Sequence, residues 1–391
     1  MTTDVLRRAR RFIALLLVAG FGSLPIAPQV SAQSPKQPTA QSTLRKSAGA
    51  NPRLIEIVSD SLGETEFRIA DEIAGAVAST QETGPNGEVA LRVTPVVSPG
   101  GIQAVRDVLT LPNADFGIAS ARVLDRLNAT RELGDLKDRI TYVTPLYVEE
   151  VHLIAGFDVR SLADLQGGAV SIGKDESATQ IIAREILSAG GLKVREERLE
   201  LRDAVAAIKA GEIAAAFLVS GKPVDGLKAL APGEGLRLVP VTLPSPPAGY
   251  LPSTLVAEDY PELLGPGERV ATLGVQNVLF AYNWPSKSPR AQLGDFFLNS
   301  LFQRLSNLQK PPRHPKWQEV NLAGTVPGYR RLAAMEAWLK RSAPQQAQQT
   351  LKSEFEQFVK ERGLPMREED REALFQNFLR WRGEPATTGS R

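Results

Sequence analysis

Cysteine is absent from the sequence, and histidine occurs only twice, at His152 and His314. Without cysteine the chain has no disulfide framework, no thiolate nucleophile, no zinc–thiolate site and no lipoprotein anchor. The two histidines stand in different sequence contexts, which argues against a histidine-centred metal site. His152 lies within an apolar run and is interpreted as a core or hinge residue. We therefore expect no metal and no other cofactor.

Long hydrophobic runs are also missing after the N-terminus, which excludes a polytopic membrane protein. The N-terminal run, residues 12–21, is too short to span a membrane. It follows four arginines and precedes the small residues Val30-Ser31-Ala32. This order is typical of a secretory signal peptide. We predict that residues 1–32 are removed and that the mature protein is periplasmic.

An excess of charge of either sign is lacking as well, because the full chain has 46 basic and 44 acidic side chains. Without the four arginines and one aspartate of residues 1–32, 42 basic and 43 acidic side chains remain, a net charge of −1. The mature chain therefore has no basic excess to release counterions from phosphates, and nucleic-acid binding has no compositional support.

The composition that is present is that of a globular protein. The chain has 391 residues, 42% of them hydrophobic, a length that allows two domains with sizeable cores. Residues 33–51 are rich in Gln, Ser, Thr, Pro and Ala, and we predict a disordered linker there.

Short β-branched runs alternate with helical patterns from about residue 53 onward. This alternation is typical of a parallel sheet with crossover helices. In this first unit strands are expected at 54–59, 90–97 and 114–120, and helices at 64–80 and 101–111.

A second unit with the same alternation follows Ile154. It includes an expected strand at 197–201 and an expected helix at 203–211, capped by Asp203. The run 275–283 then looks like a strand that leads back to the first unit. The fold class is therefore α/β with two lobes joined by a two-strand hinge, with the connections near 146–151 and 271–278. Lobe I is predicted to comprise 52–148 and 277–343, and lobe II 149–276.

The composition changes after Pro344 to a Gln-rich, charged pattern with two apolar stripes of helical period. We predict a C-terminal helical hairpin and tail over residues 344–391. Stripes of this kind most often pack on each other and on the body of the protein. The alternative is a docking surface for a partner or a second copy of the chain.

Nucleotide-binding and catalytic motifs fail on inspection. The nearest approach to a phosphate-binding loop is Ser220-Gly221-Lys222, but its earlier glycine is replaced by Ala216 and its hydroxyl residue by Pro223. No nucleophile elbow, zinc-protease motif or calcium loop occurs. An enzyme is therefore the least favoured class.

Small and hydroxyl residues follow several of the expected strands, at 59–64, 98–101, 174–179 and 220–223. Ligands collect at the carboxyl ends of strands in open α/β sheets, where helix N-termini present free N–H groups. Each segment alone is more often a structural helix cap. Together they could hold a carboxylate, with Lys174 or Lys222 as the counter-charge. The candidate ligand-binding residues are Ser59, Gly63, Thr65, Ser98, Gly100, Gly101, Ser120, Lys174, Ser177, Thr179, Ser220 and Gly221.

Five segments between residues 54 and 342 resemble the TAXI family of solute-binding subunits of TRAP transporters. They are ADFGIASARV, LYVEEVHLIAGFDVRSLADLQGGAVSIG, ESATQIIAREILSAGGL, LRDAVAAIKAGEIAAAFLVSGKP and HPKWQEVNLAGTVPGYRR. The resemblance implies a type II periplasmic binding protein. Such a protein binds a small organic acid, a carboxylate or an amino acid such as glutamate, and delivers it to TRAP membrane subunits. Contact with the membrane would occur through that partner only.

The sequence departs from the family pattern at the pocket. The turn after the first strand carries Glu64 and Glu66 where the family has no acids, and the Gly-Ser-Gly-Thr of the third loop has become 176–179, Glu-Ser-Ala-Thr. Acids near a carboxylate site repel the ligand, so an unusual solute or an accompanying cation is an alternative. A second alternative is a sensory or interaction protein that uses the same fold to contact a membrane partner.

Overall fold

The structure is a computed structural model that describes Lys46 and residues 49–78, 91–230 and 235–342. The predicted signal peptide, most of the predicted linker and the whole of the predicted C-terminal hairpin and tail lie outside the described residues. Within these ranges no helix has the length and apolar character needed to cross a membrane.

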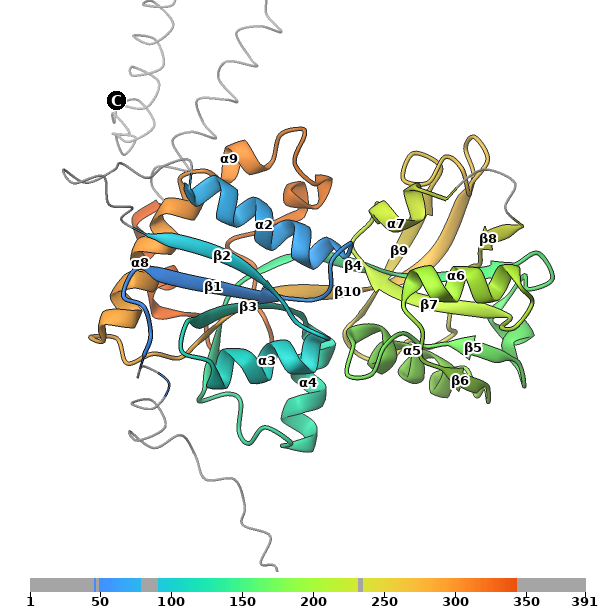
Figure 1. Ribbon diagram of the computed structural model, residues 1–391, viewed down its shortest axis with the longest axis horizontal. Helices are drawn as coiled ribbons and strands as arrows, with labels where there is room; N and C mark the ends of the chain where they lie inside the picture. The colour runs from blue at the N-terminus through green and yellow to red at the C-terminus, as the bar shows by residue number, and fades with distance from the viewer. Residues whose placement is uncertain (1–45, 47–48, 79–90, 231–234, 343–391) are drawn as a thin grey trace, which may run out of the picture. The chain divides into compact units, whose positions relative to one another are not determined.

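The strands of the described part form one sheet in the order β2-β1-β3-β10-β4-β7-β5-β6, with β8 paired to β4 and β9 paired to β10. Their bounds are β1 (Leu54–Ser59), β2 (Arg92–Val97), β3 (Ala114–Ser120), β4 (Ile140–Gly156), β5 (Ala169–Ser171), β6 (Arg195–Glu197), β7 (Ala215–Ser220), β8 (Leu236–Leu238), β9 (Tyr250–Val256) and β10 (Arg269–Tyr282). Figure 1 shows the sheet with helices on both of its faces.

The helices alternate with these strands along the chain, as predicted for an α/β protein. The α-helices are α2 (Thr65–Ala78), α3 (Gly101–Thr110), α4 (Ala121–Thr130), α5 (Ala178–Ala189), α6 (Leu201–Lys209), α7 (Asp225–Lys228), α8 (Pro289–Phe302) and α9 (Leu305–Leu308). Two 3₁₀ helices, η1 (Leu162–Leu165) and η2 (Pro315–Glu319), are also present, and residues 333–342 are helical. The predicted α/β fold class is confirmed, although the sheet is mixed rather than parallel throughout.

The first group of strands is parallel, with β1 between β2 and β3. Helix α2 covers it with apolar side chains one turn apart, Ile69, Ile73 and Val77, which are buried against Ile55 and Ile57 of β1. This spacing places the three side chains on one helix face. Packing of this helix face on β1 places the start of α2 beside the end of β1.

Strands β4 and β10 connect this first group with the strands of the second unit, among them β7 and β9. The first part of β4 pairs antiparallel with β10, and its last residues, from Glu150 onward, pair with β7. Strand β10 in turn pairs with β9 up to Val275 and with β3 from Asn277. These changes of partner fall within the two segments predicted as hinge connections. The division into two lobes that move about this hinge stays a prediction.

Two local predictions in the second unit were wrong. Residues 197–201 are not a strand, because β6 ends at Glu197 after three residue pairs with β5. The Ser171 hydroxyl then hydrogen-bonds to the backbone of Leu199, which draws the chain out of the sheet. Helix α6 consequently begins at Leu201, and Asp203 lies inside its first turn rather than at the cap.

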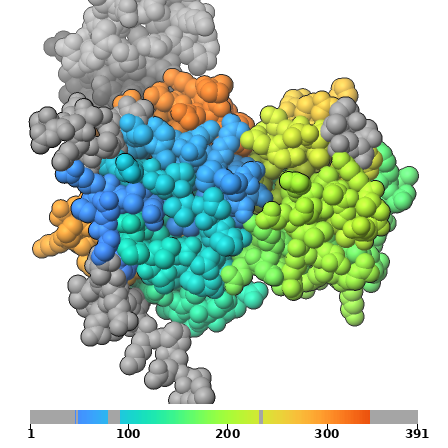
Figure 2. Space-filling model, in the orientation of Figure 1, coloured from blue at the N-terminus to red at the C-terminus, as the bar shows by residue number. Residues whose placement is uncertain are grey.

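Buried contacts join segments that are far apart in the sequence. Lys46, inside the range predicted as a linker, donates hydrogen bonds to the carbonyl oxygens of Leu111 and Ala114 at 2.6 and 3.1 Å. Lys316 of η2 lies 2.7 Å from the Glu150 carboxylate of β4, and both side chains are buried. In Figure 2 the blue segment that contains α2 touches the yellow-green segment that contains β7 and α7.

Candidate functional site

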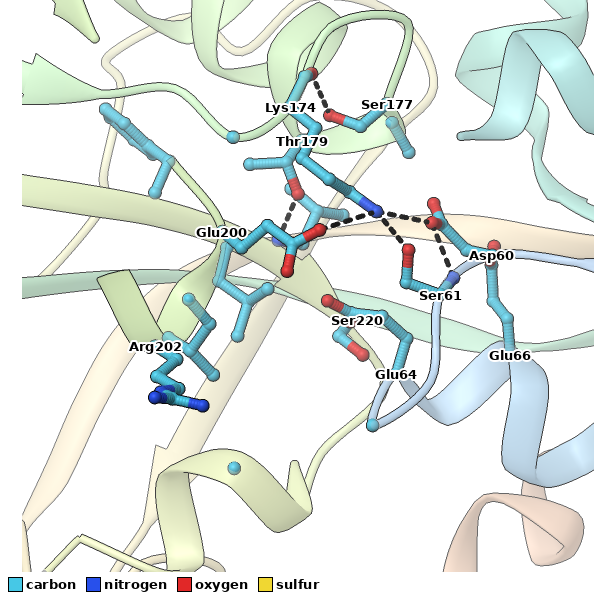
Figure 3. A pocket seen from close by; sticks show the side chains of 18 of the residues that line it. Asp60, Ser61, Glu64, Glu66, Lys174, Ser177, Thr179, Glu200, Arg202 and Ser220 are labelled. Carbon is cyan, nitrogen blue, oxygen red and sulfur yellow. Dashed lines mark hydrogen bonds and ion pairs between the residues drawn. The ribbon is translucent and has the colours of Figure 1, made fainter. Parts of the chain in front are cut away.

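A cavity of about 220 Å³ lies where the carboxyl ends of β1, β5 and β7 meet. Its walls come from the loop after β1 with the start of α2, the loop between β5 and α5, the start of α6, and β7 (Figure 3). Five of the predicted site residues line it: Gly63, Lys174, Ser177, Thr179 and Ser220. These five residues were predicted because ligand sites form at the carboxyl ends of strands, and in the structure they line one cavity there.

Lys174 is the basic side chain at the centre of this cavity (Figure 3). Its Nζ lies 3.6 Å from Asp60 Oδ1 and 3.8 Å from Glu200 Oε1, and it donates a hydrogen bond to the Ser61 hydroxyl. The ammonium is therefore already matched by two carboxylates of the protein. A second basic residue, Arg202, lines the cavity from α6 and is exposed to solvent.

The hydroxyls of Ser177 and Thr179 hold the protein chain in place. Ser177 Oγ accepts a hydrogen bond from the Gln180 N–H at 3.1 Å, which caps α5, and donates one to the Lys174 carbonyl oxygen at 2.7 Å. Thr179 Oγ1 accepts from the Val219 N–H at 3.0 Å. These bonds fix the β5–α5 loop against β7 and so shape the cavity wall.

Thr65 and Gly221 lie behind the cavity and join the start of α2 to the end of β7. The Thr65 hydroxyl donates to the Gly221 carbonyl oxygen at 2.6 Å, and the Thr65 N–H donates to Ser220 Oγ at 3.3 Å. A Cβ at Gly221 would lie 2.8 Å from the Tyr147 ring. Only glycine allows this close approach of the two segments.

The remaining predicted residues do not line the cavity. They are Ser59, Ser98, Gly100, Gly101 and Ser120, and the three serines are fully buried. Gly100 packs on the opposite loop instead, because a Cβ there would lie 2.8 Å from the Glu176 carbonyl oxygen. The Ile102 N–H donates to the same oxygen at 3.2 Å. The two loops predicted to hold a ligand thus contact each other directly.

Carboxyl groups dominate the cavity wall: Asp60, Glu64, Glu66 and Glu200 all line it. Burial, with a further contribution from the Asp60 charge, raises the pKa of Glu64 to about 8. Among the described residues no basic side chain forms an ion pair with Glu64 or Glu66. A negatively charged group in this part of the cavity would meet like charge.

A further carboxyl, that of Glu149 in β4, is linked to Glu66 through the side chain of Asn277. Asn277 Nδ2 of β10 donates to both carboxyls, at 2.8 Å to Glu66 Oε1 and at 2.8 Å to Glu149 Oε1. Burial raises the pKa of Glu149 to about 7 and, together with the Glu149 charge, raises the pKa of Glu66 well above its usual range. Two carboxyls this close and this buried do not both ionise readily.

Sequence reasoning missed Glu149, Asn277 and the neighbouring Tyr147 as parts of the site. The only signal was two adjacent acids, Glu149 and Glu150, within an otherwise apolar strand. In the part of the chain that the structure describes, no group of His, Asp and Glu side chains is arranged to hold a metal ion.

Three solved structures illustrate what the fold is similar to. The aliphatic sulphonate binding protein SsuA from Escherichia coli is 16% identical, with 84% of this chain and 84% of that chain covered and a TM-score of 0.38. An amino acid ABC transporter substrate-binding protein from Streptococcus pneumoniae, bound to L-arginine, is 14% identical over 68% of this chain and 91% of that chain, with a TM-score of 0.39. The regulatory domain of CcmR from Synechocystis PCC6803, in complex with 2-PG, is 14% identical over 67% and 99%, with a TM-score of 0.38.

A family comparison identifies the chain more directly than these structures do. Residues 59–288 match the NMT1-like family, a range that includes every segment lining the cavity. The narrower resemblance to TAXI subunits stays a prediction. Because the match spans more than half of the chain, the protein belongs to the NMT1-like family.

Proposed function

We propose that this protein is a periplasmic solute receptor that binds a small organic molecule in the cavity at the ends of β1, β5 and β7. The observation that carries the proposal is the cavity itself, which is walled by polar side chains from segments more than a hundred residues apart. Enclosed sites with a few convergent polar groups are typical of small-molecule binding. No chemical step is proposed, since the receptor releases the solute unchanged.

The mode of binding follows from where the walls originate. Residues 60–66 belong to the predicted lobe I, and residues 173–220 to the predicted lobe II. A solute held by both walls favours the arrangement in which they touch, and domain closure of this kind moves about a few hinge residues. The changes of partner along β4 and β10 are suitable places for such a hinge.

The chemical class of the solute and the membrane partner are proposed from the sequence. The predicted solute is a small organic acid, a carboxylate or an amino acid such as glutamate. Lys174 and the N-termini of α2 and α5 at the cavity support an anionic group there. The predicted partner is the membrane part of a TRAP transporter, reached after export.

Native mass spectrometry of the mature protein, purified without denaturation, tests the receptor proposal. We expect a bound small molecule whose removal lowers the melting temperature and whose addition restores it. Reconstitution with TRAP membrane subunits then distinguishes transport from the sensory alternative, which predicts no solute uptake. If no small molecule co-purifies and none of a panel of organic acids and amines raises the melting temperature, the receptor proposal is wrong.

A further inference from the structure

The Glu66–Glu149 pair, whose two carboxyls are bridged by the Asn277 amide, meets the cavity at Glu66. Glu66 lines the cavity (Figure 3), and Glu149 is 1% exposed behind it. Among the described residues, the Asn277 amide is the side chain that donates hydrogen bonds to both carboxyls.

Three buried polar atoms in and beside this pair lack a hydrogen-bond partner among the described residues. Glu149 Oε2, Asn277 Oδ1 and the Tyr147 hydroxyl are buried without a hydrogen-bond partner in the described part of the chain, and their side chains are at most 1% exposed. Native proteins seldom leave buried polar groups unpaired, so three such atoms in one place require a physical explanation. All three accept hydrogen bonds; the Asn277 oxygen accepts only, and so does Glu149 once its carboxyl is ionised. A donor group is the natural complement.

The charges that face the pair are almost all negative. The acidic groups Asp60 and Glu64 face it from the loop after β1, and Glu150 from β4, where the neighbouring Tyr147 hydroxyl is uncharged. Lys174, the nearest cation of the cavity wall, is engaged by Asp60 and Glu200. This part of the cavity therefore favours a positive charge with several N–H donors.

We propose that the solute carries a positively charged amine, which binds beside the Glu66–Glu149 pair and donates hydrogen bonds to its carboxyl oxygens. This inference rests on the proposed function and names the solute class for the same cavity. An ammonium supplies up to three donors and one positive charge, so it satisfies the unpaired acceptors and allows both carboxyls to ionise. The displaced proton leaves to the solvent. The carboxylate predicted from the sequence is then at most a second group, at the Lys174 end.

Three probes of matched chain length separate the alternatives: succinate, with two carboxylates; 4-aminobutyrate, with one of each group; and putrescine, with two amines. Isothermal titration of the full mature protein, in two buffers of different ionisation enthalpy, measures affinity and proton release together. We expect at least one amine probe to bind at least about tenfold more tightly than succinate, with release of up to about one proton per molecule bound. The affinity for that probe should rise from about pH 6 to about pH 8.

Substitution of the pair provides the matched test. Glu66→Gln and Glu149→Gln keep the side-chain size and remove the exchangeable proton, so each should weaken amine binding by about tenfold or more and reduce or abolish proton release. Asp107→Asn, a carboxyl-to-amide change on α3 outside the cavity, should leave both quantities unchanged. If the glutamine variants do not fold, the wild-type titrations still decide.

Two results would overturn the inference. The first is tighter binding of succinate than of both amine probes, which leaves the receptor proposal intact. The second is the absence of any amine binding, or amine binding without proton release in either buffer. Failure of all three probes, combined with the absence of a co-purified solute, counts against the receptor proposal itself.

Discussion

Ser177 uses its hydroxyl to start α5 and to tie down the loop before it, with Gln180 and Lys174 as backbone partners. Ser177→Ala removes both bonds and should lower the free energy of unfolding by about 0.5–2 kcal/mol, as for other helix N-caps. Urea unfolding measures the loss. Ser188→Ala, at the exposed end of the same helix, is the control and should change stability by less than about 0.5 kcal/mol. Equal effects of the two substitutions would mean that the cap contributes nothing.

The Glu66–Glu149 pair gives a pH dependence whose sign can be worked out. A glutamate in the unfolded chain has a pKa of about 4.3, whereas burial raises the pKa of Glu149 to about 7 and raises the pKa of Glu66 well above its usual range. The folded protein therefore holds more protons than the unfolded chain over that range. Its stability falls as the pH rises through it.

The double variant Glu66→Gln/Glu149→Gln isolates this contribution, because other titrating groups cancel in the difference from the wild type. We expect the stability of the variant, relative to the wild type, to increase from about pH 5 to about pH 8. Urea unfolding at several pH values in that interval provides the measurement. A difference that stays constant with pH contradicts the assignment of a shared proton.

Among the elements, the loop 98–101 and the β5–α5 loop make the closest backbone contact of the site, at Gly100 and Glu176. Gly100→Ala places a Cβ 2.8 Å from a backbone oxygen and should destabilise the protein by about 1–3 kcal/mol. Gly75→Ala is the matched control, because that position in α2 has open space around it and should gain about 0.5–1 kcal/mol. Thermal unfolding of both variants should show shifts of opposite sign. Shifts of the same sign would show that the loop contact is not formed.

The same elements show how far sequence reasoning reaches. Strands β1 and β3 were predicted to the residue, because each is a short apolar run between turn residues. The bounds of β6 and α6 were wrong, because a tertiary hydrogen bond from Ser171 decides where the chain leaves the sheet. Local pattern contains no information about that partner.

Site residues that follow the ends of strands were predictable from the sequence. Site residues in the interior of two paired strands were not. Lys174, Ser177 and Ser220 follow strands, so a general rule of α/β sheets identifies them. Glu149 and Asn277 lie in the interior of β4 and β10, and only the register of these two strands brings them together behind α2. A shift of one residue in that register would turn both side chains to the opposite face.

For the whole molecule, the first testable property is its N-terminus. Removal of residues 1–32 should leave Gln33 as the first residue of protein recovered from the periplasm. N-terminal sequencing of cell-envelope and cytoplasmic fractions checks this. Recovery of a soluble cytoplasmic form that retains Met1 as the sole product would contradict both the signal peptide and the proposed location.

The position of β10 in the sheet has a consequence for how the chain is made. Strand β3 ends at Ser120, yet its neighbour β10 begins only at Arg269, and β10 also fills the place beside β4. The middle of the sheet therefore cannot form until nearly three quarters of the chain has left the ribosome. Pairings of such long sequence separation form slowly. A nascent chain without its central strand stays open for longer, which would leave more time for export before the sheet closes.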